Sequence, residues 1–304
     1  MKNIIDNFIA NRAECVNISC KTLIVTVFGD VVSQHGHWVW IGSLIESLSN
    51  LGYSERLVRT SVFRLVEDDW LQVKKIGRKS YYSLTISATN HNLKASRRIY
   101  KSSSLSENND WLILLPSFVT DEKLPELKKQ LKWLGFSSIS SSVYAHPSFD
   151  KNSLEETIKE LDLVESVVIF SGKTVDQNSN AVLKKLVFQK WNLSELTGKY
   201  DQFLEDYRPI LMQLENESST ANSDKISFSL RLLLIHEFRR ILLNDHELSA
   251  NMLPSDWSGK SARVLVKNIY QYLEKKSIKY ITQNLQNSNG SLLKPSEEFY
   301  TRFK

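Results

Sequence analysis

The stretch Ser54–Leu84, SERLVRTSVFRLVEDDWLQVKKIGRKSYYSL, decides how the rest of the chain is interpreted. Its first half predicts a short helix, with Ser54 as the N-cap and Glu55 in the first turn, where a carboxylate suits the helix dipole. At helical spacing the apolar residues fall on one face and most charged residues lie away from it. The apolar face consists of Val58, Val62, Leu65 and Val66.

The second half of the stretch predicts a two-stranded hairpin with a basic tip. Apolar and polar residues alternate on both sides of the tight turn 76–79, which carries Gly77, Arg78 and Lys79. A helix with basic residues near its start, followed at once by such a hairpin, is typical of a winged helix-turn-helix, in which the helix enters the major groove and the wing touches the backbone. The residues expected to contact DNA are Ser54, Arg56, Arg59, Thr60, Arg64, Lys75, Arg78 and Lys79.

The distribution of charge favours the same interpretation. Residues 54–101 contain eleven Lys and Arg against four acids, a net charge of +7, whereas the whole chain carries only +5. Duplex DNA selects for a concentrated positive field because each neutralised phosphate releases counterions. A basic hairpin can also be merely solvated, but next to this helix and turn DNA contact is the better explanation.

The residues before this stretch supply what a winged-helix domain needs. Residues 15–36 predict an amphipathic helix that ends at Gly36, residues 38–40 a short strand, and residues 41–51 a second helix with Gly52 as C-cap. We expect the aromatic residues of the region to be core rather than base-stacking groups. They are Trp38, Trp40, Phe63, Trp70, Tyr81 and Tyr82.

Beyond residue 87 the pattern changes twice. A polar, basic helix and the loop SSSLSENND lead into strands that alternate with helices, which indicates a small ferredoxin-like α/β sandwich. In it WLILLP, SSISSSVYAHP and SVVIFSG are the expected strands. From about residue 181 the chain is predominantly helical, and Pro209 is expected to kink or restart a helix. The predicted class is therefore α+β multidomain, with a winged-helix domain at 1–87, a linker helix and loop at 88–108, a ferredoxin-like domain at 109–180 and a helical domain at 181–304.

The composition is that of an ordinary globular protein, 41% hydrophobic and 24% charged. The only cysteines, Cys15 and Cys20, imply no disulfide framework. Charges interrupt the apolar start of the chain, and no run approaches the roughly 18 apolar residues of a membrane-spanning helix. We therefore expect a soluble cytoplasmic protein.

Catalytic and metal motifs are not apparent. Two GK[ST] triplets, at 172–174 and 259–261, lack the glycine that a phosphate-binding loop needs five residues earlier. The six histidines show no metal-ligand spacing, and His35 and His37 are expected to be solvated. We therefore expect no catalytic site, no metal and no cofactor.

Several segments together make the chain similar to a known family. They are SLIESLSNLGYSERLVRTSVFRLVEDDWL, IGRKSYYSLT, LKKQLKWLGF, YRPILMQL, LLLIHEFRRILLND, LPSDWSGKSAR and NIYQYL. The chain resembles, nearly end to end, the PaaX family of transcriptional repressors of bacterial phenylacetic acid degradation operons. The resemblance implies an N-terminal winged helix, a central domain similar to the Cas2 fold, a helical C-terminal domain, and repression that phenylacetyl-coenzyme A relieves. A nuclease role suggested by the Cas2 likeness is set aside, because Asp110 has no second acid to hold a metal with it.

The effector would need an apolar slot and basic donors for its phosphates. The helix 226–244 is apolar on nearly every side yet carries His236, Arg239 and Arg240. These residues either line the acyl-CoA site or form a structural ion pair with Glu237, Asp245 or Asp256. The residues expected at the effector site are His236, Arg239, Arg240, Trp257, Lys260 and Arg263.

The sequence thus predicts a repressor of phenylacetate catabolism genes that phenylacetyl-CoA releases from DNA. One recognition helix covers only a few base pairs, so a homodimer on an inverted-repeat operator is expected. The alternatives are an enzyme acting on acyl-CoA or nucleic acid with a winged-helix docking module, and an architectural DNA binder without an effector.

Overall fold

The computed structural model describes residues 4–15, 18–100, 111–147, 151–216, 223–246, 248 and 250–304. The chain forms two compact units. Unit 1 comprises Met1–Ser102, Phe203–Arg239 and Ala262–Lys304, and unit 2 comprises Ser103–Gln202 and Arg240–Ser261. Unit 1 thus contains the predicted winged-helix region together with much of the predicted C-terminal domain.

The N-terminal part of unit 1 contains the elements that the sequence predicts around the opening stretch. Three antiparallel strands form a sheet in the order β1-β3-β2. The predicted first helix is shorter than expected, because it begins at Cys20 and is replaced after Asp30 by a 3-10 turn. The elements are α1 (Ile4–Cys15), α2 (Cys20–Asp30), η1 (Val32–Gln34), β1 (Val39–Trp40), α3 (Ile41–Ser49), α4 (Glu55–Glu67), β2 (Leu71–Ile76), β3 (Lys79–Leu84) and α5 (Ile86–Tyr100).

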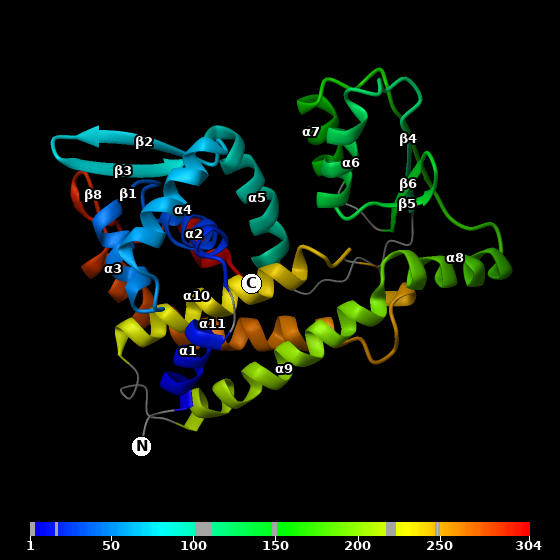
Figure 1. Ribbon diagram of the computed structural model, residues 1–304. Helices are drawn as coiled ribbons and strands as arrows, with labels where there is room; N and C mark the ends of the chain where they lie inside the picture. The colour runs from blue at the N-terminus through cyan, green and yellow to red at the C-terminus, as the bar shows by residue number, and fades with distance from the viewer. Residues whose placement is uncertain are drawn as a thin grey trace. The chain divides into compact units, whose positions relative to one another are not determined.

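The C-terminal part of the chain adds three long helices, α9 (Leu193–Asn216), α10 (Asp224–Leu242) and α11 (Ser258–Asn284) (Figure 1). Each of these helices contributes residues to both units. The predicted effect of Pro209 is wrong in part, because α9 continues through it. The helix break lies instead at Asn192, which has a positive φ of 46°.

The C-terminal tail, residues 285–304, is mostly polar but contains a few apolar residues that pack in unit 1. It forms β8 (Gln286–Asn287), β9 (Gly290–Ser291) and the 3-10 helix η3 (Glu297–Thr301). Leu292, Phe299 and Phe303 are buried in unit 1. The tail is therefore part of the core of unit 1.

Unit 2 contains a four-stranded antiparallel sheet in the order β5-β6-β4-β7. Its elements are β4 (Trp111–Leu115), α6 (Leu124–Trp133), β5 (Ser137–Ser140), β6 (Val143–Pro147), α7 (Lys151–Glu160), β7 (Val168–Gly172) and α8 (Gln177–Lys190). The prediction of one strand over SSISSSVYAHP is wrong, since residues 141–142 make the turn of a hairpin.

Side chains alternate across this sheet as the pleat requires. Leu112 and Leu114 pack with residues of α6 and α7, such as Leu127 and Leu154. Trp111 points to the other face, into a cluster that includes Trp191 at the end of α8. Both faces of the central strand β4 are therefore covered, whereas the edge strand β7 is exposed.

Within the part of the chain that the structure describes, no helix is long and apolar enough to cross a membrane.

Candidate nucleic-acid interface and the buried arginine cluster

The helix α4 is positioned by its cap and its apolar face. The Oγ atom of Ser54 accepts a hydrogen bond from the backbone N–H of Leu57 at 3.3 Å, as predicted for an N-cap. Val58, Val62 and Leu65 are buried on one face. Ser54 was also expected to contact DNA; in the structure its side chain caps α4.

The opposite face of α4 is exposed and mostly basic. Arg56, Thr60 and Arg64 lie on it, and the side chains of Arg56 and Arg64 have no hydrogen bond or ion pair with any residue that the structure describes. Arg59 is also exposed, but its guanidinium pairs with Glu55, with Nε 2.8 Å from Oε1. An exposed pair of this kind is weak, so Arg59 is only loosely held.

Phe63 does not belong to the core, so the prediction for this residue is wrong. Its side chain is 62% exposed on the basic face of α4. Tyr81 is buried as predicted, and Trp38, Trp40, Trp70 and Tyr82 are partly buried. The helical spacing could have predicted this exposure, because Phe63 directly follows Val62 and is not one of the positions that form the apolar face of the helix.

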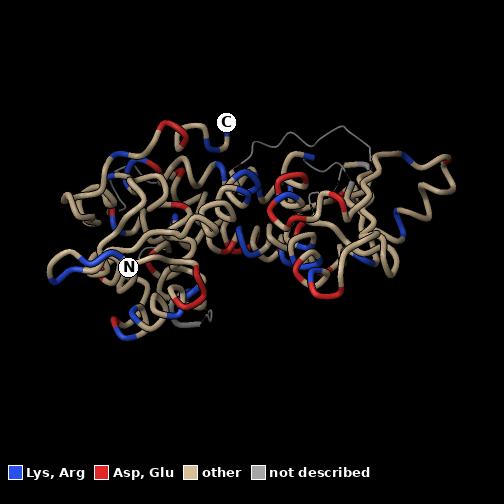
Figure 2. The backbone as a smooth tube through the Cα atoms, turned by 90° about the horizontal axis from the view of Figure 1, so that it is seen from above, with Lys and Arg blue, Asp and Glu red and all other residues tan. Residues whose placement is uncertain are grey.

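The hairpin β2–β3 carries the second group of cations. Ile76 pairs with Lys79, so Gly77 and Arg78 form a two-residue turn in which Gly77 has a φ of 58°. Lys75 and Arg78 are exposed, whereas the Nζ atom of Lys79 lies 4.2 Å from the centre of the Trp40 ring. The hairpin is a projecting basic ribbon, and Figure 2 shows its Lys and Arg residues along the strands.

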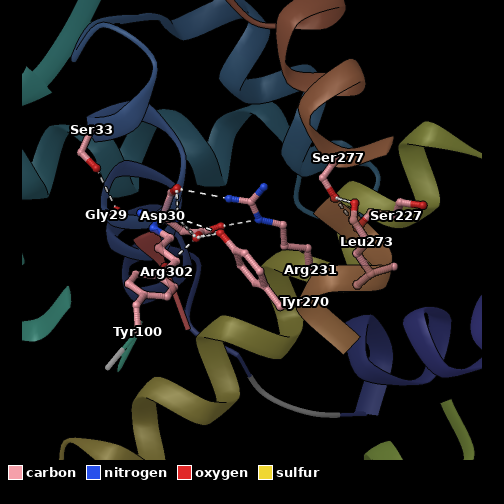
Figure 3. Close-up of polar contacts among 10 residues, drawn as sticks. All are labelled: Gly29, Asp30, Ser33, Tyr100, Ser227, Arg231, Tyr270, Leu273, Ser277 and Arg302. Atoms are coloured by element: carbon pink, nitrogen blue, oxygen red, sulfur yellow. Dashed lines mark hydrogen bonds and ion pairs between the residues drawn. The ribbon is translucent and has the colours of Figure 1, made fainter. Parts of the chain in front are cut away.

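A second polar centre in unit 1 is buried. The carboxylate of Asp30, at the end of α2, is 2.9 Å from Nε of Arg231 on α10 and 2.8 Å from Nη1 of Arg302 (Figure 3). The hydroxyl of Tyr100 donates to Oδ1 of Asp30 at 2.5 Å and that of Tyr270 at 3.2 Å. These five residues, the Asp30 cluster, join α2, α5, α10, α11 and the tail.

Aromatic rings surround the two arginines of the Asp30 cluster. The guanidinium carbon of Arg302 is 3.9 Å from the ring centre of Tyr100, and that of Arg231 is 4.6 Å from Tyr270. Both arginines also lie over the ring of Phe299. The rings offset part of the cost of burying two cations beside one carboxylate.

The charges in the Asp30 cluster stabilise one another. Burial by itself raises the pKa of the Asp30 carboxyl, but Arg231 and then Arg302 more than offset this, and the pKa lies below its usual value. Burial raises the pKa of Tyr270 to about 12. The centre therefore holds an ionised carboxylate between two guanidinium groups, and both tyrosines stay neutral hydrogen-bond donors.

His35 lies beside the Asp30 cluster and contradicts the prediction of a solvated side chain. It is 0% exposed, and its Nδ1 atom is 2.6 Å from the carbonyl oxygen of Leu293 in the tail. Burial lowers the pKa of His35 to about 4. His37, by contrast, is exposed as predicted.

The residues expected at the effector site are divided between the units. In unit 1, His236 is 1% exposed, with Nδ1 3.0 Å from Oγ1 of Thr26 on α2. Arg239 is half-buried, and burial lowers its pKa. Arg263 donates from Nη1 to the carbonyl oxygen of Arg98 at 2.8 Å.

In unit 2, the expected effector residues are more accessible. Arg240 and Lys260 are exposed. The half-buried Trp257 packs edge-on against Tyr200, with 5.5 Å between the two ring centres.

The predicted acidic partners of the His236–Arg240 segment have contacts elsewhere. Glu237 lies 3.3 Å from Nε of Arg12, and Asp245 accepts a hydrogen bond from the hydroxyl of Tyr200 at 2.6 Å. Asp256 is exposed.

Side chains that could ligate a metal ion are not grouped within the described ranges. No group of three or more His, Cys, Asp and Glu side chains there is arranged to hold a metal ion. Asp110, which was considered for a nuclease role, lies outside the described residues.

Sequence reasoning missed the Asp30 cluster. Asp30 and Arg231 are charged residues inside long apolar runs, VFGDVV and SFSLRLLLI, and a buried charge implies an opposite partner. Charged residues in apolar runs therefore predicted a buried ion pair but did not show that Asp30 pairs with Arg231. No feature of the polar tail predicted that Arg302 joins them.

Comparison with known proteins covers nearly the whole chain. Residues 19–88 match the family model described as PaaX-like protein, residues 108–183 the PaaX protein central Cas2-like domain, and residues 191–283 the PaaX-like protein C-terminal domain. The transcriptional repressor PaaX of Escherichia coli (strain K12) is 33% identical over 299 residues, which are 98% of this chain and 94% of that protein. Among solved structures, the uncharacterized protein Rv0674 from Mycobacterium tuberculosis matches with 19% identity and a TM-score of 0.49, over 85% of this chain and 97% of that chain. The resemblance noted in the sequence is therefore confirmed: the chain belongs to the PaaX family.

Proposed function

We propose that the chain is a DNA-binding transcriptional repressor of phenylacetate catabolism genes, a binding protein rather than an enzyme. The observation that carries the proposal is the exposed basic face of α4 together with the projecting basic hairpin β2–β3. The name of the Escherichia coli relative, a transcriptional repressor, supports the same role.

In this proposal α2 to β3 form a winged helix-turn-helix, and α4 is its recognition helix. Arg56, Thr60 and Arg64 contact bases, because they lie on the exposed face of the helix and two of them have free guanidinium groups in the described structure. Lys75 and Arg78 contact phosphates from the wing. The strand order of unit 2 supports a ferredoxin-like sandwich for the central domain.

Phenylacetyl-CoA is the proposed effector, on the strength of the family resemblance. Its phosphates require cations that solvent can reach, which favours the exposed Arg240 and Lys260 over the buried His236. His236 contacts Thr26 of α2, so in our proposal it transmits the effect of the ligand to the DNA-binding helices without touching the ligand.

The repressor is proposed to act as a homodimer on an inverted repeat, because one recognition helix reads too few base pairs for an operator. Sedimentation of the protein with operator DNA tests this. A monomer bound to a single half-site would contradict it.

The proposed function is tested by gel shift on the promoter next to the protein's own gene, with a scrambled duplex of equal length as control. We expect a shift of the promoter that phenylacetyl-CoA abolishes and that free CoA and phenylacetate do not. Equal affinity for both duplexes would refute specific repression. A specific shift that no metabolite reverses would refute the effector alone.

A further inference from the structure

Phe63 is the most exposed large apolar residue of α4 and lies on its basic face. It follows Arg56 by seven residues and Thr60 by three, so all three lie on one side of the helix. Val58 and Leu65 face the core on the other side. The position of Phe63 therefore comes from the helix geometry, and rotating the side chain cannot bury it in its own unit.

The ring of Phe63 has no partner in the part of the protein that the structure describes. It is 62% exposed, and no described aromatic ring or cation packs on it. Around it stand Arg56, Thr60 and Arg64, which are also exposed. Arg56, Thr60 and Arg64 suit phosphates and the polar edges of bases, whereas the ring of Phe63 does not. If this face of α4 binds DNA, the ring needs an apolar group on the same surface of the DNA.

Within the major groove, that feature is the 5-methyl group of thymine, and apolar side chains including Phe are its usual contacts. Resting on the proposed function, we propose that Phe63 reads a thymine methyl group in the operator and is a specificity-determining residue. Arg56 and Thr60 precede Phe63 by two helical turns and one helical turn. Following α4 from its N-terminus along the groove, the base contacted by Arg56 therefore comes first and the thymine contacted by Phe63 comes after it.

The test uses operator duplexes in which one thymine at a time is replaced by deoxyuridine, which removes only the methyl group. With the wild-type protein, replacing one particular thymine in each half-site is expected to lower affinity about fourfold, because the buried contact of one methyl-sized group is lost. Phe63→Ala is expected to bind the unmodified operator roughly tenfold more weakly and to be indifferent to that replacement.

The matched control is Phe118→Ala, because Phe118 is a 79% exposed phenylalanine in unit 2. This variant should keep the wild-type affinity and the wild-type response to deoxyuridine. The scan on wild-type protein needs no variant to fold, so it decides the question by itself if Phe63→Ala is unstable.

The outcomes separate the inference from the function on which it rests. If no thymine replacement weakens wild-type binding to a specific operator, or if Phe63→Ala responds to the same replacement as the wild type, the inference is wrong and the repressor proposal stands. If the wild-type protein does not prefer the operator to scrambled DNA, the proposed function has failed first.

Discussion

Two groups of arginines in unit 1 carry the same charge in opposite surroundings. The side chains of Arg231 and Arg302, 0% and 6% exposed, share the carboxylate of Asp30 and lie over aromatic rings. Arg56 and Arg64 are exposed on α4, without a partner among the described residues. A guanidinium paired with a buried carboxylate is committed to the fold, because removing one partner of a buried pair is costly, whereas a guanidinium left in water is available to a phosphate or a base.

The contrast also explains how the DNA-binding elements are supported. Asp30 ends α2, and its partners come from α5, α10, α11 and the tail. Ser296 of the tail donates its backbone N–H to the carbonyl oxygen of Gln34 at 2.9 Å. The basic face of α4 is thus presented by a unit whose core includes residues more than 200 positions away in the sequence.

The largest expected effect comes from breaking the buried group. Replacing Arg231 by Met leaves Asp30 paired with Arg302 at Oδ1 but removes the hydrogen-bonded cation from Oδ2, and should lower the free energy of unfolding by about 3–5 kcal/mol. Urea unfolding measures the change. Arg64→Ala, the control on the exposed group, should stay within about 0.5 kcal/mol of wild type. Similar losses for both variants would remove the distinction between the two groups.

The second effect concerns pH. His35 is neutral when folded, with its pKa lowered by burial to about 4, whereas the unfolded chain binds this proton near pH 6.5. The stability that the neutral ring contributes is therefore complete above pH 6.5 and is lost as the pH falls through 4. The loss amounts to about 3 kcal/mol.

The variant His35→Asn keeps a donor for the carbonyl oxygen of Leu293 but cannot titrate. It should unfold with a flatter pH dependence between pH 7 and pH 4 than wild type, and His37→Asn, at an exposed position, should not. Urea titrations at several pH values give the slopes. Parallel curves for wild type and His35→Asn would show that another group is responsible.

How far the sequence predicted this architecture depends on the range of the interactions involved. The helix α4, its cap and the hairpin follow from local periodicity and turn residues, so they were predictable from 31 consecutive letters, residues 54–84. The roles of Asp30 and Arg302 depend on a contact 272 positions apart. No local pattern encodes that pairing, and the same reason explains why His35 was expected in solvent.

The third effect concerns DNA binding and distinguishes two exposed arginines of α4, Arg56 and Arg59. Arg56→Ala should cost about 1–3 kcal/mol on the operator and less on random DNA, as expected for a base contact. Arg59→Ala, at another position expected to contact DNA, should cost less, because its guanidinium is already paired with Glu55. Fluorescence anisotropy on both duplexes measures the losses. Equal losses on operator and random DNA would mean that Arg56 touches only phosphate.

The wing should behave differently from α4. Lys75→Ala and Arg78→Ala should weaken binding to all duplexes alike, and each should reduce the slope of log affinity against log salt by about one, the value for one phosphate contact. Titrations at several salt concentrations give the slope. A loss confined to the operator would assign these residues to base readout instead.

The smallest expected effect on stability is the most useful test of the comparison, because it uses the same helix as the largest. Arg231 and Arg240 both lie on α10, but Arg240 is exposed. Arg240→Ala should change the free energy of unfolding by no more than about 0.5 kcal/mol and leave operator affinity intact.

If Arg240 binds the phosphates of the effector, the variant should resist release by phenylacetyl-CoA. His236→Ala is the counterpart inside the core: it loses the contact with Thr26 and should destabilise the protein. A variant of Arg240 that unfolds as readily as that of Arg231 would show that exposure does not separate the two roles, and normal release would place the phosphate contact on other cations.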